Sequence, residues 1–436
     1  EFFMAMDGKE LVEKLAKLSQ VQSIKDIPQL THALFPGTHC PLMGAAMAVG
    51  GIKDSLIVVV GTDECTYYAK SMTVHSEKFG GIGGRCVSVV LDDHDVTFGS
   101  AEKVQEAFKE IVEEYRPQCV FLVTTCVIEI IGDDFDAIAE GLSELYGIPV
   151  LPVHTEHFKC EDHLPGLERT ITVCAEMMEP RACDNSVNLL GQRMGDFATT
   201  ELYAMLQKAG IKIGLQLPCG CTVDDIKNAA AAKVNIVVND IALPLAQKMQ
   251  EKFGTPYVYF NKFVIPEKIY EAYKNLFGYL ELNLPEELEG LYQKAKAETA
   301  AAKPELNGIT YIYGNTPYAV FEMNCFLSFL GMIPQVIQTN RYTEADAPYA
   351  REILQYTDPY VCKAANIAPL QYVYDVLSPY LYLGHEFGNR LRQKGIAIVH
   401  SDRASGMLGF EVTGYLMQQL VKSVREAKEY RRELGL

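Results

Sequence analysis

Short, continuous apolar runs recur along the 436-residue chain and alternate with helix-like stretches. The first clear runs are SLIVVVG (55–61), CVSVVLDD (86–93) and CVFLVTTC (119–126). A run that is apolar at every position is typical of a parallel strand buried on both faces. Stretches with helical periodicity and capping residues follow at 100–117 and 133–147. The alternation predicts an α/β fold with doubly wound parallel sheets.

The same alternation restarts twice further along the chain. We therefore expect three successive α/β domains: residues 1–184 with an N-terminal arm, residues 185–304, and residues 305–436. A long charged helix at 284–303 should end at Pro304 and connect the second and third domains. Loops at the carboxyl ends of parallel strands carry the binding sites of such sheets, so ligands should meet those loops.

The composition excludes several classes of partner. The net charge is −17 and the isoelectric point is near 5.1, which argues against binding to nucleic acid or to an anionic membrane surface. No apolar run reaches the roughly 18 residues that cross a bilayer. The N-terminus lacks the basic and apolar segments of a signal peptide. We therefore expect a cytoplasmic protein whose twelve cysteines are core residues, metal ligands or catalytic groups.

Three cysteines stand at candidate loop positions in the first third of the chain. Cys40 precedes Pro41 at a loop-to-helix junction, Cys65 follows the run 55–61 through a turn, and Cys126 ends the run 119–126. Thiolates are favoured near helix starts and hold iron–sulfur clusters. Taken singly, each is more often a small buried apolar residue, and no CxxC motif supports a metal site.

Longer motifs surround these cysteines. The chain has Cys-Pro-Leu-x-Gly-Ala at 40–45, Val-Thr-Phe-Gly-Ser at 96–100, and Thr-Cys…Ile-Gly-Asp-Asp at 125–134 followed by Tyr-Gly-Ile-Pro-Val. In these motifs it resembles the component 1 family of nitrogenase and nitrogenase-like reductases. The resemblance is dense over 38–158 and weaker beyond. It implies three Rossmann-like domains around a central cavity.

The resemblance also implies a metal site. In that family three cysteines of the first domain hold a cluster at the interface with a homologous subunit, and Cys40, Cys65 and Cys126 fall on those positions. Their separations of 25 and 61 residues favour a [4Fe–4S] cluster over the family's [8Fe–7S] cluster. The partner would be a homologous component 1 subunit or a second copy of this chain. One departure is the turn Gly-Thr-Asp-Glu-Cys, where the family has Gly-Pro-x-Gly-Cys.

A second site is implied in the central cavity, where the family holds a metallocluster or a tetrapyrrole. The cofactor-binding cysteine position of nitrogenase falls on Asn239, and an amide is a poor iron ligand. The cofactor-binding histidine position falls on His400, which is a candidate catalytic residue or a hydrogen-bonded histidine at a strand end. Cys219 and Cys221 in LQLPCGC form a compact pair that either binds a cofactor or lies in a tight glycine turn.

These features lead to one main functional hypothesis and two alternatives. The main one is a subunit of a nitrogenase-like oxidoreductase that receives low-potential electrons from an ATP-dependent iron protein. This chain has no GxxxxGK[ST] motif, so ATP would be used by that partner. The first alternative is a scaffold for assembly of a nitrogenase-type metallocluster. The second is a metal- or tetrapyrrole-binding α/β protein without redox catalysis.

Overall fold

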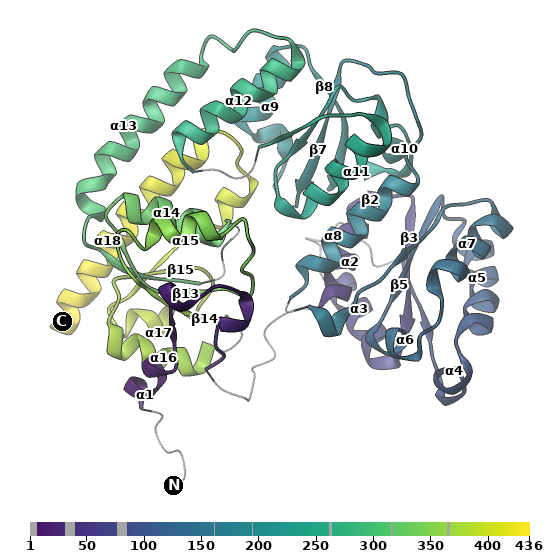
Figure 1. The fold of residues 1–436 in the computed structure, drawn as a ribbon, viewed down its shortest axis with the longest axis horizontal. Coiled ribbons are helices and arrows are strands. Elements are labelled where there is room, and N and C mark those ends of the chain that lie inside the picture. The colour runs from purple at the N-terminus through teal and green to yellow at the C-terminus, as the bar shows by residue number, and fades with distance from the viewer. Residues whose placement is uncertain are drawn as a thin grey trace.

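The computed structural model contains three α/β units, each built on a parallel sheet (Figure 1). It describes residues 7–30, 40–75, 85–160, 162–193, 195–260, 264–314, 316, 318–363 and 367–436. The predicted fold class, three doubly wound parallel sheets, is confirmed. None of the described helices combines the length and the apolar character that crossing a bilayer requires.

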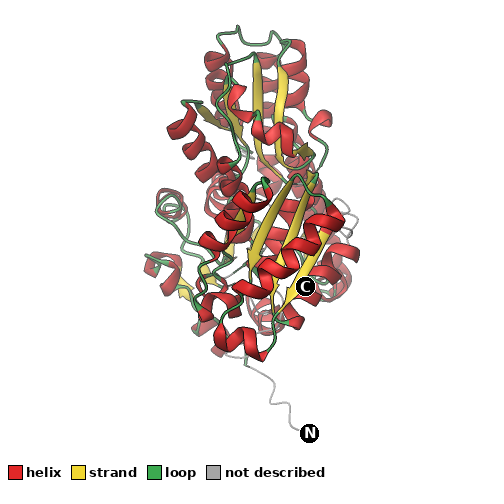
Figure 2. Cartoon of the chain, turned by 90° about the vertical axis from the view of Figure 1, so that its right-hand side faces the viewer, coloured by secondary structure: helices red, strands yellow, loops and turns green. Residues whose placement is uncertain are grey.

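The first unit is a four-stranded parallel sheet between two helical layers. Its order is β4-β3-β5-β6, so the chain leaves β3 to one side for β4 and then returns to the other side for β5. Leu56, Val58 and Val60 of β3 pack into one core cluster, and Ile57 and Val59 pack into another. This two-sided burial explains why the strand reads as a continuous apolar run. Figure 2 shows strands lying between helices on this side of the molecule.

The elements of the first unit have these bounds. The strands are β3 (Ser55–Gly61), β4 (Cys86–Val90), β5 (Cys119–Thr124) and β6 (Val150–Val153). The helices are α2 (Pro41–Gly50), α3 (Asp63–His75), α4 (Asp93–Phe98), α5 (Ala101–Tyr115), α6 (Cys126–Ile131), α7 (Phe135–Tyr146) and α8 (Leu164–Val173).

The second unit repeats this topology. Its parallel sheet has the order β11-β10-β7-β8, so β7 and β10 are the central neighbours between which the winding reverses. The strands are β7 (Ser186–Gln192), β8 (Lys212–Pro218), β10 (Val234–Val237) and β11 (Tyr257–Tyr259). The helices are α9 (Glu201–Lys208), α10 (Val223–Lys227) and α11 (Leu243–Phe253), and the two-residue strand β2 (Ile52–Lys53) pairs with β9 (Cys221–Thr222).

The third unit has a six-stranded sheet of order β1-β14-β13-β12-β15-β16, in which only β1 is antiparallel to its neighbour. The strands are β1 (Ala16–Lys17), β12 (Thr310–Tyr313), β13 (Ile333–Gln338), β14 (Tyr360–Cys362), β15 (Leu381–Leu383) and β16 (Ala397–Val399). The helices are α1 (Gly8–Glu13), α14 (Val320–Phe329), α15 (Ala347–Ile353), α16 (Ile367–Leu377), α17 (Gly388–Arg392) and α18 (Glu411–Leu434).

The N-terminal segment differs from the expected domain division. Residues 7–30 join the third unit, although the sequence places them with the first. Ala16 and Lys17 pair with β14, the Leu18 amide donates to the Pro359 carbonyl at 2.9 Å, and Leu18 is 1% exposed. The physical reason is an open edge: β14 would otherwise leave a row of unpaired backbone groups.

Two long helices connect the second and third units. They are α12 (Pro266–Leu280) and α13 (Leu288–Leu306), which lie on the outer side of the molecule in Figure 1. We expected the second of these helices to end at Pro304, but it continues to Leu306. Ala302 and Leu306 are buried in a core of the third unit, and this packing compensates for the backbone hydrogen bond that proline cannot make.

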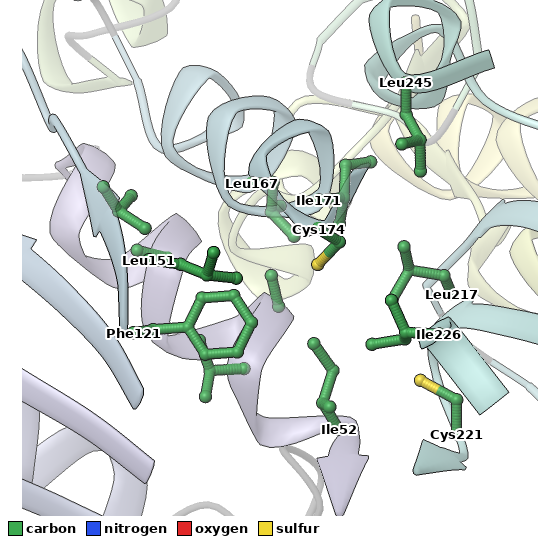
Figure 3. Packing of buried hydrophobic residues seen from close by; sticks show 14 of the residues in the cluster. Ile52, Phe121, Leu151, Leu167, Ile171, Cys174, Leu217, Cys221, Ile226 and Leu245 are labelled. Carbon is green, nitrogen blue, oxygen red and sulfur yellow. The ribbon is translucent and has the colours of Figure 1, made fainter. Parts of the chain in front are cut away.

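The first and second units share one hydrophobic core. Phe121 and Leu151 of the first sheet and Leu217 and Ile226 of the second unit belong to the same buried cluster, with Ile171 of α8 between them (Figure 3). The third unit is built on separate clusters. The first two units therefore form one packed body, to which the third is attached.

Candidate functional site

The three predicted cysteines all lie at helix starts in the first unit. Cys40 is the residue immediately before α2, Cys65 is in the first turn of α3, and Cys126 is the first residue of α6. The last two helices follow β3 and β5, the adjacent strands between which the winding of the sheet reverses. Such a switch point is where open α/β sheets bind ligands.

Cys65 and Cys126 interact directly. Burial raises the pKa of the Cys126 thiol, and the charge and a hydrogen bond of Cys65 raise it further. Gly61 permits this approach, because a Cβ built on it would overlap the Thr125 side chain. The turn after β3 thus packs against the turn before α6.

Cys40 belongs to the same region. Burial raises the pKa of Tyr68, and the charge of Cys40 adds to this effect. Tyr68 lies in α3, one turn beyond Cys65. All three cysteines are free thiols of intermediate exposure, so each is accessible from outside the core.

This donor set fits an iron–sulfur cluster. Thiolates at helix starts are the ligands that such clusters take, and a [4Fe–4S] cluster uses four of them. Three thiols on one accessible face leave a ligand position for another chain. Bound metal would reverse the effect of burial, because coordination displaces the thiol protons.

An apolar surface lies around the end of α6, the helix that begins at Cys126. Phe98, Ile130 and Phe158 are 76%, 70% and 71% exposed, and a hollow of about 370 Å³ is lined by Ile130 and Phe158 together with Glu129 and Lys159. Large exposed side chains of this kind mark protein interaction surfaces. The part of the first unit that carries the three cysteines and this apolar surface is called the cysteine face below. It has the character of a protein interface.

The predicted residues of the central site lie at strand ends of the second and third units. Asn239 caps the 3₁₀ turn Asp240–Ala242, and its side chain accepts a hydrogen bond from the Ile241 amide at 3.2 Å. His400 follows the edge strand β16 and is exposed. The loop after His400 reaches the second unit, where Gln192 donates to the Gly406 carbonyl at 3.4 Å.

The structure places Cys219 and Cys221 in different surroundings. Cys219 is half-buried, and its thiol donates to the Arg193 carbonyl at 3.3 Å. Cys221 is 1% exposed and packs in the shared core (Figure 3), where burial raises its pKa to about 12. Only Cys219 is therefore available to a ligand in the described structure.

Sequence reasoning missed several charged residues that lie where the three units meet, a region called the centre below. Arg193 follows β7, Asp240 follows β10, and Arg341 follows β13, while His163 and Glu168 belong to the start and body of α8. Arg193 Nη2 lies 3.2 Å from His163 Nε2, and Arg193 and Arg341 are close enough to repel each other. For Arg193 and Arg341, the position just after a predicted strand was the available signal.

Asp240 carries the largest acid shift at this centre. The surrounding protein removes much of its hydration, and Glu322, Asp346 and Glu168 repel its charge more strongly than Arg341 attracts it. Together they raise its pKa to about 6. Asp240 nevertheless stays accessible to solvent, and it accepts a hydrogen bond from the Tyr259 hydroxyl. The centre thus presents a carboxyl group that exchanges protons near neutral pH.

Comparison with curated proteins finds relatives in nitrogen fixation. The chain is 31% identical over 224 residues to the nitrogenase iron-molybdenum cofactor biosynthesis protein NifE of Clostridium pasteurianum, covering 50% of this chain and 49% of that protein. It is 27% identical over 330 residues to NifE of Rippkaea orientalis, covering 72% and 69%. It is 24% identical to the nitrogenase molybdenum-iron protein alpha chain of Methanosarcina barkeri, covering 56% and 48%. The match to the first of these relatives thus spans about half of that protein's length.

Comparison with solved structures concerns the fold. A structure of nitrogenase Cp1 at pH 6.5 superposes with a TM-score of 0.78 at 16% identity, covering 93% of this chain and 96% of the other. Residues 40–425 match the family described as nitrogenase component 1 type oxidoreductase. This match includes the three cysteines, both central arginines and all of the second unit, so the chain belongs to the nitrogenase component 1 family.

Proposed function

We propose that this chain is a subunit of a nitrogenase-like reductase, in which Cys40, Cys65 and Cys126 hold an iron–sulfur cluster at a subunit interface. The observation that carries the proposal is the meeting of Cys65 and Cys126 at the switch point of the first sheet. Family membership supports iron–sulfur chemistry at this place. When bound, such a cluster accepts and releases single electrons at low potential.

The role of the first unit is to hold the three thiols in place. Cys65 and Cys126 are on short connections after buried strands, so the sheet sets the position of their backbones. Gly61 lets the two connections pack closely. The proposed partner is a homologous component 1 subunit or a second copy, which would complete the ligand set and cover part of the apolar surface of Phe98, Ile130 and Phe158.

The electrons are proposed to come from an ATP-dependent iron protein and to pass to a substrate or metallocofactor at the centre. There, Cys219 and Asn239 are the candidate cofactor contacts of this chain, and His400 is a candidate proton donor. Asn239 is engaged in capping a turn, which supports a positioning contact rather than an iron ligand.

Metal content tests the cysteine assignment. We expect Cys65→Ser and Cys126→Ser, purified without oxygen, to lose most of the iron and sulfide of the native chain together with its visible absorption. Cys183→Ser is the matched control, because Cys183 is an exposed free cysteine outside the group. Full iron content in both variants would refute the proposed ligand set.

A scaffold for metallocluster assembly is the second candidate. The NifE relatives favour it, since their name assigns them to cofactor biosynthesis. The two functions differ in what leaves the centre. A scaffold transfers an intact metallocluster to an acceptor protein, whereas a reductase consumes electrons and releases a reduced small molecule over many turnovers. Measuring both with the purified complex decides between them.

A further inference from the structure

The centre of the molecule contains two arginines that form no ion pair with any acidic residue the structure describes. Arg193 lies just after β7 of the second unit, and Arg341 lies just after β13 of the third. Among the ion pairs formed by described residues, neither guanidinium has a carboxylate within 4.0 Å. Most half-buried arginines are neutralised by a nearby acid, because leaving the charge uncompensated is costly.

Part of the Arg193 guanidinium makes no hydrogen bond to the residues that the structure describes. Its Nη2 faces His163 Nε2 at 3.2 Å, and its Nε is buried without a hydrogen-bond partner in the described structure. Arg341 has its backbone fixed by the Thr339 side chain, which receives a hydrogen bond from the Arg341 amide at 3.1 Å and donates to the Arg341 carbonyl at 2.7 Å. No side-chain hydrogen bond holds the Arg341 guanidinium among the described residues.

The charges around the two guanidinium groups also favour the binding of an anion. Burial lowers the pKa of Arg193, and the positive charge of Arg341 lowers it further. Asp162 opposes this effect at Arg193, and Glu168 and Asp240 interact with Arg341, yet all three acids stay beyond ion-pair distance. Burial is also the main reason why the pKa values of Glu168 and Asp240 are raised.

We propose that the Arg193 and Arg341 guanidinium groups together bind an oxyanion, a carboxylate or phosphate group, of the ligand that occupies the centre. A planar guanidinium presents paired donors that match the two oxygens of such a group. Two arginines from different units would also fix the third unit against the second when the ligand is bound. The inference rests on the proposed function in taking the centre as the ligand site, and it adds the chemical class of that ligand.

Oxyanion binding can be measured on the full chain. Calorimetric titrations with inorganic phosphate and with succinate, each against chloride at equal ionic strength, should show binding of at least one oxyanion. Arg341→Met should weaken it roughly tenfold to a hundredfold, the usual effect of losing a charge-assisted hydrogen bond. Arg193→Met should act in the same direction. Arg181→Met is the matched control and should bind as the native chain, because Arg181 is exposed and paired with Glu179.

The outcomes separate clearly. Binding of phosphate alone identifies a phosphate-bearing ligand, and binding of succinate alone identifies a carboxylate. The inference is overturned if neither anion binds better than chloride, or if Arg341→Met binds as tightly as the native chain. Because the Arg341 guanidinium makes no hydrogen bond or ion pair among the described residues, that variant should fold even if Arg193→Met does not. Repeating the titration with Cys65→Ser distinguishes this inference from the cluster assignment, since oxyanion binding should survive there.

Discussion

At the scale of single residues, the centre and the cysteine face contain different kinds of ionisable group. Burial raises the pKa of the Cys126 thiol, and metal binding would displace the thiol protons of the cysteines at these helix starts. The centre instead gathers ionisable groups from three units, among them Asp240, whose pKa is raised to about 6. In the proposed function, electrons would enter at the cysteines, and protons would be handled in a different part of the chain.

Asp240 gives a pH-dependent prediction. Its folded pKa of about 6 lies above the usual 3.8, so the folded state binds its proton more tightly than the unfolded state does. The native chain should therefore lose stability as the pH rises from about 4 to about 6, and Asp240→Asn should remove this loss. Solvent reaches Asp240 and screens its charge. We therefore expect Asp240→Asn to raise the free energy of unfolding by an amount on the order of 1 kcal/mol at pH 7.

Urea unfolding of the native chain and of Asp240→Asn at several pH values measures this difference. The two midpoints should separate between pH 4 and pH 6 and then stay apart. Asp224→Asn, an exposed position on α10, serves as the control for the change in net charge. A constant difference at all pH values would contradict the assignment of this titration to Asp240.

At the scale of elements, the packing of α2 on α8 fixes Cys40 next to the centre. Two glycines make this crossing close: a Cβ on Gly44 would overlap the His163 carbonyl, and one on Gly166 would overlap the Pro41 carbonyl. Cys40 and His163 stand at the starts of the two helices. The crossing therefore sets the position of a proposed cluster ligand relative to a residue that contacts Arg193.

Gly166→Ala tests this crossing. The added methyl group meets backbone atoms, which cannot rotate away, so we expect a loss of about 1–3 kcal/mol in the free energy of unfolding. Gly141→Ala in α7 is the matched control, because nothing lies within 4 Å of its Cβ position. That change should be neutral or should stabilise by roughly 0.5–1 kcal/mol, since alanine is the better helix former. If the two variants changed the free energy of unfolding equally, the packing of α2 on α8 would not depend on the close approach of the two helices.

The strands and the three-unit architecture were predictable from sequence, since the largely apolar runs 55–61 and 119–126 contain β3 and β5, whose residues are all buried. The three cysteines were found through motifs. Arg193 and Arg341 were not, because single arginines after strands resemble ordinary surface residues until the units are placed together. Cys221 could not be separated from Cys219, because sequence does not tell which side of a glycine turn faces the core.

At the scale of the whole molecule, the first and second units share one core, and the third unit is attached to them. The N-terminal segment, residues 7–30, pairs with one edge of the third unit's sheet. Leu11 and Leu30 pack in one core cluster of that unit, and Leu18, Val21 and Ile27 pack in another. Ser19 adds two hydrogen bonds to the Asp358 carboxylate, at 2.8 and 3.0 Å. The segment is thus a structural part of the third unit.

Leu18→Ala should loosen this unit selectively. Removing a buried leucine side chain costs about 2–5 kcal/mol, and the loss should appear locally at the sheet edge that Leu18 covers. Hydrogen exchange should become faster in β14 and in residues 16–21 while β3 and β5 keep their protection. Leu145→Ala, at a 73% exposed position of α7, should leave both regions unchanged. Faster exchange in β3 would instead show that the first unit depends on this segment.

The pairing of β1 with β14 also has a consequence for synthesis. Ala16 pairs with Val361, which is 345 positions further along the chain. At roughly 5–20 residues per second, a ribosome needs roughly 20–70 s to supply that partner strand. Until then the N-terminal segment lacks the strand with which it pairs, and α16, which packs on α1, is made later still. The first and second units can complete their shared core during this interval, while the N-terminal segment waits for the third unit.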